Sequence, residues 1–118
     1  MDRMKVLIID DETDLCLLLK SYILGKDKNY EVHISHSLAD GLANISTKMP
    51  GIIFLDNDLP DGAGWDKAPE IARNYPGMHI NLISAYHPEV PEMPAEAQFF
   101  VYEKPISLAD LDQYFHNP

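Results

Sequence analysis

Ile52-Ile53-Phe54-Leu55-Asp56 is a run of four large apolar residues that stops at a carboxylate. Three other apolar runs also stop at polar side chains: Val6 to Ile9 before Asp10-Asp11, Ile80 to Ile83 before Ser84, and Phe99 to Tyr102 before Glu103-Lys104-Pro105. Short β-branched and aromatic runs separated by helical stretches are typical of parallel strands joined by crossover helices. Such open sheets bind ligands beyond the carboxyl ends of their strands. We therefore expect the polar ends of the four runs to form one site.

The stretches around these runs predict strands and helices in alternation. Strands are expected over residues 5–10, 30–35, 51–56, 79–84 and 99–104, and helices over 12–24, 37–47, 65–74 and 107–116. The first helix rests on apolar residues at helical spacing, namely Leu15, Leu18, Leu19, Tyr22 and Ile23, and Gly25 supplies its stop. Ser37-Leu38-Ala39-Asp40 has the spacing of a capping box. The alternation predicts an α/β fold with a doubly wound, five-stranded parallel sheet.

Two segments rich in turn formers interrupt the pattern. Leu59-Pro60-Asp61-Gly62-Ala63-Gly64 predicts a loop directly after Asp56. Farther along, Pro88, Pro91 and Pro94 fall where a fourth helix would be expected. Each interior proline costs a helix about 3 kcal/mol, because it removes a backbone donor and clashes with a preceding carbonyl. We expect helix four to be degenerate or missing, with residues 85–97 largely non-helical and mobile.

Composition describes an acidic globular domain. The chain has 118 residues, 46% of them hydrophobic, and nine basic against nineteen acidic residues give a net charge of −10. We expect one domain over residues 1–118, which is also compatible with a piece of a longer protein. The charge argues against direct nucleic acid binding and favours a protein or cationic partner. No run resembles a signal peptide or membrane span, so we expect a cytoplasmic protein without membrane contact. The single cysteine, Cys16, is interpreted as a buried thiol rather than a reactive one.

The three aspartates at the strand ends predict a metal site. Asp10, Asp11 and Asp56 would place up to three negative charges within a few ångströms, which requires protonation or a cation. Oxygen ligands without histidine or cysteine favour Mg²⁺. The alternative for Asp11 is that it only caps the following helix.

The remaining strand ends suggest phosphoryl chemistry. Asp56, ionised at neutral pH, can attack phosphorus without a general base. Lys104 can place a point charge on a phosphoryl oxygen, and Ser84 can donate a hydroxyl hydrogen bond, so that positioning and electrostatics promote the transfer. Taken singly, these residues would be a turn aspartate, a solvated strand-end lysine and a helix cap.

Taken in order, Asp10-Asp11, Asp56, Ser84-Ala85 and Lys104-Pro105 resemble the motif set of response-regulator receiver domains. The resemblance implies a flavodoxin-like sheet of strand order 2-1-3-4-5. It also implies a two-component phosphorelay, in which Asp56 takes a phosphoryl group from a histidine kinase or histidine phosphotransfer protein.

The same resemblance implies roles for individual residues. Mg²⁺ would be held by Asp10, Asp11, Asp56 and the main-chain carbonyl of Asp58. Ser84 and Lys104 would contact the phosphoryl oxygens, and the side chains of Asp58 and Tyr86 would tune dephosphorylation. Such a domain is a signalling phosphoacceptor that catalyses its own phosphorylation and dephosphorylation, and it signals by changing conformation or by binding an unidentified downstream protein.

The chain departs from the receiver pattern in its output region. Receivers often carry a switch aromatic three residues before the lysine, where this chain has Val101 between Phe100 and Tyr102. Together with the three prolines, the valine at position 101 predicts how the phosphorylation signal reaches a partner. We expect it to pass through residues 85–97, or through the surface around the last strand and last helix, rather than through a dimer formed by helix four.

Two other functions compete with this interpretation. Phe54-Leu55-Asp56-Asn57-Asp58 also resembles the Asp-x-Asp motif of haloacid-dehalogenase-type phosphohydrolases. The chain is short for that family, and its acidic pair precedes the nucleophile instead of following it. The second alternative is a receiver-like interaction module that binds partners without phosphorylation, which would be favoured if the acidic cluster bound no metal.

Overall fold

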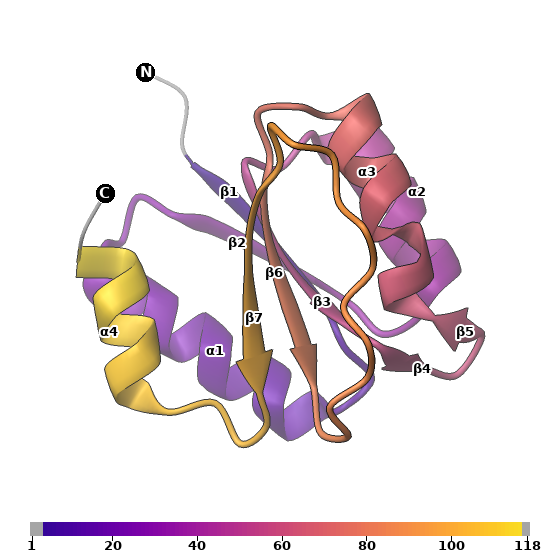
Figure 1. Cartoon of the computed structure of the whole chain (residues 1–118). Coiled ribbons are helices and arrows are strands. Elements are labelled where there is room, and N and C mark those ends of the chain that lie inside the picture. The colour runs from indigo at the N-terminus through magenta and orange to yellow at the C-terminus, as the bar shows by residue number, and fades with distance from the viewer. Residues whose placement is uncertain (1–3, 117–118) are drawn as a thin grey trace.

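The computed structural model describes residues 4–116, so residues 1–3 and 117–118 of the expected domain lie outside the described residues. Its centre is a parallel sheet of five strands (Figure 1). In chain order these are β1 (Lys5–Ile9), β2 (Glu31–Ser35), β3 (Ile52–Asp56), β6 (His79–Ser84) and β7 (Gln98–Glu103). Their order in the sheet is β2-β1-β3-β6-β7. Because β6 and β7 are the fourth and fifth of these strands, the predicted order 2-1-3-4-5 is confirmed.

Helices cover both faces of the sheet (Figure 1). The helices are α1 (Thr13–Lys26), α2 (Leu38–Lys48), α3 (Ala68–Asn74), which follows the 3₁₀ turn η1 (Gly64–Lys67), and α4 (Leu108–His116). Residues of α2 and α3 pack against one face, and residues of α1 and α4 against the other. Among residues 4–116, no helix has both the length and the apolar character needed to cross a membrane.

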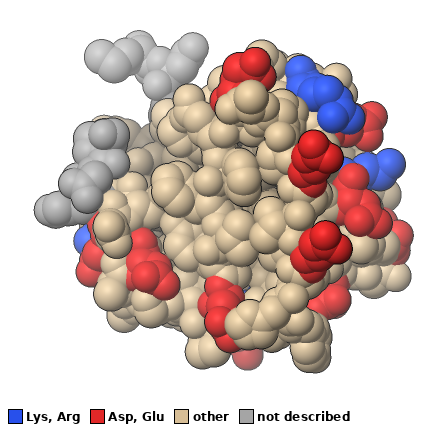
Figure 2. Space-filling view, in the orientation of Figure 1, with Lys and Arg blue, Asp and Glu red and all other residues tan. Residues whose placement is uncertain are grey.

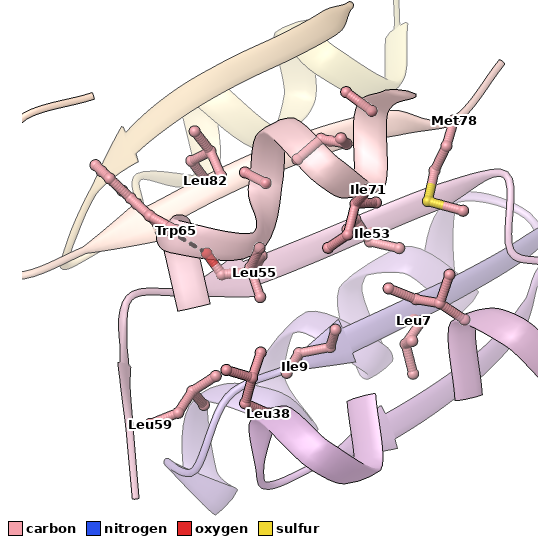
Figure 3. Packing of buried hydrophobic residues seen from close by; sticks show 14 residues of the cluster. Leu7, Ile9, Leu38, Ile53, Leu55, Leu59, Trp65, Ile71, Met78 and Leu82 are labelled. Carbon is pink, nitrogen blue, oxygen red and sulfur yellow. Dashed lines mark hydrogen bonds between the residues drawn. The ribbon is translucent and has the colours of Figure 1, made fainter. Parts of the chain in front are cut away.

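Every residue of β3 is buried, as expected for the central strand of a sheet covered on both faces. Figure 3 shows Leu55 of β3 beside Trp65, whose indole Nε1 donates a hydrogen bond to the Leu55 carbonyl at 3.1 Å. Trp65 is only 3% exposed. It therefore anchors the segment after β3 to the strand that carries Asp56.

The first helix differs from its prediction in two details. It runs through Gly25 to Lys26, and the backbone N–H of Asp27 closes it on the Ile23 carbonyl. A helical glycine costs only about 1 kcal/mol relative to alanine, which packing of the helix can offset. Leu18, expected on the apolar face, is 58% exposed, while Cys16 is fully buried as expected.

The predicted loop after Asp56 contains a short antiparallel hairpin, β4 (Asp58–Leu59) with β5 (Gly62–Ala63). At the turn between them, the Asp61 carboxylate accepts hydrogen bonds from the backbone N–H groups of Leu38 and Ala39 at 2.7 and 2.9 Å. These bonds lower the pKa of Asp61. The predicted Ser37 cap is present, with its hydroxyl accepting from the Asp40 N–H at 3.2 Å. The hairpin thus ties the segment after Asp56 to the start of α2.

Residues 85–97 form no helix, as the proline spacing predicted. The segment runs as an extended connection between β6 and β7 and is coloured orange in Figure 1. Met93 and Ala97 are partly buried against the core cluster beneath α2 and α3, and Phe99 of β7 packs there too. Residues 85–97 are thus an irregular segment in the place where a helix would precede the last strand.

Candidate functional site

Three carboxylates meet at the carboxyl edge of the sheet. Asp10 directly follows β1, Asp11 comes next, and Asp56 is the last residue of β3. One carboxylate oxygen from each lies within 4.8 Å of the other two. Asp10 and Asp56 are 0% and 1% exposed, whereas Asp11 is exposed. The structure therefore brings together the three residues that the strand-end pattern predicted.

Hydrogen bonds fix the backbone of Asp10 from several directions. Its N–H donates to the Ser35 carbonyl of β2 at 3.0 Å. Its own carbonyl accepts from the Cys16 thiol at 3.2 Å and lies 2.9 Å from Nδ1 of His36. Burial, with repulsion from Asp10, raises the pKa of Cys16 to about 12, so this thiol stays protonated and serves as a donor. The carboxylate is oriented by the Glu12 N–H, which donates to Asp10 Oδ1 at 2.9 Å.

Asn57, the first residue after Asp56, fixes the following segment by hydrogen bonds. The Asn57 N–H donates to the Ile83 carbonyl of β6 at 3.1 Å, and the Asn57 side-chain oxygen accepts from the Trp65 N–H at 3.1 Å. Gly64 also donates its N–H to the Asn57 carbonyl at 3.0 Å. A Cβ at Gly64 would lie 2.1 Å from the Asp56 carbonyl oxygen, so the chain can pass this close to the acceptor strand only as glycine.

The Lys104 ammonium lies among the carboxylates. This residue follows β7, and its N–H donates to the Ser84 carbonyl at 2.9 Å. Its Nζ lies 3.1 Å from Asp10 Oδ2 and 3.5 Å from Asp56 Oδ2, and the side chain is 11% exposed. Burial alone lowers the pKa of Lys104, but its contacts with Glu12 and Asp10 outweigh burial and raise it. The site therefore holds a permanent cation.

One ammonium does not balance the buried negative charge. Burial first, and then repulsion from Asp10, raises the pKa of Asp56 to about 6 despite attraction by Lys104. Burial likewise raises the pKa of Asp10. Within residues 4–116, no donor meets Asp10 Oδ2 or either oxygen of Asp56 with good hydrogen-bond geometry, although the Lys104 ammonium lies close to both carboxylates. Buried carboxylate oxygens that are poorly supplied with donors, gathered at one edge, fit a hard cation such as Mg²⁺.

Two predicted site residues take less defined positions. Ser84 ends β6 and is 3% exposed, and its hydroxyl accepts from the Tyr86 N–H at 3.3 Å. Asp58 is exposed at the start of the hairpin. Ser84 ends a strand at the same edge of the sheet as Asp56, and Asp58 is two residues after Asp56 in the chain. The contact of Ser84 with a phosphoryl group and the metal bond of the Asp58 carbonyl stay predictions.

The sequence interpretation missed one residue of this site, Glu12. Its Oε1 accepts a hydrogen bond from Lys104 Nζ at 2.6 Å. The two residues are 92 positions apart in the chain, so no local spacing links them. The available signal was that the acidic run continues from Asp10 through Glu12.

Known proteins resemble this chain over most of its length. Residues 6–116 match the response regulator receiver domain family. The chain is 32% identical to the transcriptional regulatory protein DpiA of Escherichia coli (strain K12) over 110 residues, which are 92% of this chain and 49% of DpiA. It therefore spans about half the length of this relative.

Solved structures share the fold at low sequence identity. A response regulator receiver domain protein (CheY-like) from Methanospirillum hungatei JF-1 has a TM-score of 0.79 at 24% identity, covering 97% of this chain and 91% of that one. The response regulator protein TrrA from Thermotoga maritima, in complex with Mg²⁺-BeF, has a TM-score of 0.79 at 22% identity, covering 95% and 96%. At these identities the likenesses show that the fold is shared.

Proposed function

The chain belongs to the response regulator receiver domain family of two-component signalling, and we propose that Asp56 is its phosphoacceptor. The observation that carries the proposal is the state of the Asp56 carboxylate. It is 1% exposed at the end of the central strand, neither oxygen has a hydrogen-bond donor in good geometry among the described residues, and the Lys104 ammonium, on a side chain 11% exposed, lies 3.5 Å away. A nucleophile with free lone pairs beside a fixed cation suits attack on a phosphoryl group.

Asp10, Asp11, Asp56 and the main-chain carbonyl of Asp58 would hold Mg²⁺. The support is the close approach of the three carboxylates and the Mg²⁺-BeF complex of TrrA. When bound, the ion neutralises the carboxylates and the phosphoryl oxygens, which lets an anionic donor approach.

The residues of the chain then carry out an in-line transfer. An Asp56 carboxylate oxygen forms a bond to phosphorus while the bond to the donor histidine nitrogen breaks, and the electron pair of that bond returns to the imidazole. Lys104 and Ser84 would donate to the phosphoryl oxygens. Water would later attack the same phosphorus, under the influence of the side chains of Asp58 and Tyr86. The donor would be a histidine kinase or histidine phosphotransfer protein in the cytoplasm.

The test is incubation with a small acyl phosphate, with Mg²⁺ or with a chelator, followed by intact mass measurement. A phosphoacceptor gains one phosphoryl group only when Mg²⁺ is present. Steady hydrolysis of a small phosphate ester would revive the phosphohydrolase alternative, which the family match does not favour. No labelling, together with no Mg²⁺ binding, would favour an interaction module.

Replacing Lys104 with alanine is expected to leave Mg²⁺ affinity unchanged or higher. The ammonium lies 3.1 Å from Asp10 Oδ2 and 3.5 Å from Asp56 Oδ2, where its positive charge repels a metal ion bound to the same oxygens. Isothermal titration calorimetry would measure the affinity, with Asp10→Asn as the variant expected to lose it. A large loss of affinity in Lys104→Ala would show that this lysine supports the metal site instead.

Output is proposed to pass through the surface formed by residues 85–97, β7 and α4. Val101 is 47% exposed and Phe100 52% exposed on β7. Figure 2 shows acidic side chains around a largely uncharged centre on this face, which suits a downstream protein better than nucleic acid.

Hydrogen exchange would test this route of output. Residues 85–97 are expected to exchange rapidly in the free domain, because they form no helix, and to change their exchange on phosphorylation. The strands of the sheet serve as the internal reference for slow exchange. Strong protection across the segment that phosphorylation leaves unchanged would count against this route.

A further inference from the structure

The shortest contact of the Lys104 ammonium is with Glu12. Nζ lies 2.6 Å from Glu12 Oε1, against 3.1 Å from Asp10 Oδ2 and 3.5 Å from Asp56 Oδ2. Of these contacts, the one to Glu12 has the geometry of a hydrogen bond. The lysine is thus held most closely by Glu12, whose side chain is exposed at the rim of the site.

Glu12 is built differently from the two buried aspartates. Its N–H donates to Asp10 Oδ1 at 2.9 Å, and its carbonyl accepts from the Cys16 N–H at 3.0 Å, so its backbone is fixed. It occupies the N-cap position of α1, yet its side chain accepts no hydrogen bond from that helix. The side chain is 58% exposed. Its carboxylate can therefore leave the lysine for water without disturbing Asp10.

We propose that Glu12 is a positioning residue that holds the Lys104 ammonium in the unphosphorylated domain and yields it to the phosphoryl group on Asp56. The proposal rests on the proposed function. A phosphoryl group on Asp56 places new anionic oxygens near an ammonium that already lies 3.5 Å from Asp56 Oδ2. An ammonium has three donors, and a part-exposed ion pair is weak enough to exchange. Glu12 thereby sets how readily Lys104 reaches the phosphoryl group.

Removing Glu12 has a specific consequence. In Glu12→Gln the ammonium loses its charged rim partner, so a phosphoryl group on Asp56 no longer has to displace it. We expect affinity for beryllium fluoride, a phosphoryl analogue, to rise about two- to fivefold at saturating Mg²⁺, the range of a part-exposed ion pair. In a Lys104→Ala background the same substitution should change the affinity less than about twofold, because no ammonium is left to release.

The experiment uses four variants of the whole chain with the wild type: Glu12→Gln, Asp14→Asn, Lys104→Ala and the double variant Glu12→Gln/Lys104→Ala. Asp14 is exposed in the first turn of α1, so Asp14→Asn removes an equal charge near the site without touching the lysine. Beryllium fluoride affinity is measured by titration calorimetry with Mg²⁺. The Lys104 ammonium signal is followed by ¹⁵N NMR without Mg²⁺, where Glu12→Gln should shift it and speed its hydrogen exchange, and Asp14→Asn should not.

An equal effect of Glu12→Gln with and without Lys104, or equal effects of Glu12→Gln and Asp14→Asn, would overturn the positioning role. An unchanged Lys104 signal in Glu12→Gln would overturn the contact itself. Failure of the wild type to bind beryllium fluoride would instead overturn the proposed function and the exchange that rests on it. In that case the NMR arm still decides whether Glu12 holds the lysine.

Discussion

Replacing Asp56 with asparagine is expected to abolish phosphorylation by a small acyl phosphate in the presence of Mg²⁺. A neutral amide oxygen is a poor nucleophile, and the substitution also removes one of the three clustered carboxylates. Intact mass spectrometry would measure the fraction of protein labelled.

The matched control is Asp66→Asn, which removes one exposed carboxylate from the same region of the chain. This variant should label as the wild type does. If Asp56→Asn labels as well as the control, the phosphoacceptor is another residue and the assignment of Asp56 is wrong.

The same substitution is expected to stabilise the domain in the absence of Mg²⁺. Burial and repulsion from Asp10 raise the pKa of Asp56 from 3.8 to about 6, so the ionised carboxylate opposes folding at neutral pH. A shift of this size corresponds to about 3 kcal/mol at most, and solvent screening at the site edge reduces it. We expect Asp56→Asn to raise the free energy of unfolding by about 1–3 kcal/mol, measured by urea denaturation in a chelator.

The advantage of the variant should depend on pH. Above about pH 6 the carboxylate is ionised in both states and folding carries the full cost. As the pH falls through about 6 toward 3.8, the folded state binds a proton before the unfolded state does, so the wild type gains stability. The gap between wild type and variant should therefore shrink as the pH falls from about 6 to 3.8. If the difference in unfolding free energy between wild type and variant stays constant with pH, the ionised Asp56 carboxylate does not destabilise the folded domain.

Much of this fold follows from local sequence. β3 is a run of four apolar residues before Asp56, and β6 is apolar except for His79, Asn81 and the final Ser84. Strands covered on both faces of a parallel sheet favour such apolar runs. The absence of a helix over residues 85–97 was equally predictable, since a missing N–H is a local property of proline. Glycine is a weaker signal than proline, and Gly25 did not stop α1 because its cost is small beside the packing of a whole helix.

Some contacts of the site could be identified only from the folded structure. The meeting of Asp10 and Asp56 could be predicted, because parallel strands carry their carboxyl ends to one edge. The hydrogen bond between Glu12 and Lys104 could not be predicted, because the two residues are 92 positions apart in the sequence. Their contact depends on the direction that the lysine side chain takes in the folded domain. The hairpin that places Asp61 on the start of α2 was hidden for the same reason, since its turn residues indicate only a loop.

The central claim is that Asp56 itself carries the phosphoryl group. Borohydride reduction of the phosphorylated protein converts an aspartyl phosphate to homoserine, and peptide mass spectrometry then locates that residue. The account predicts homoserine at position 56 alone, and only in samples phosphorylated with Mg²⁺. Homoserine at position 10 or 11, or a phosphoryl group that forms equally well in chelator, would contradict it.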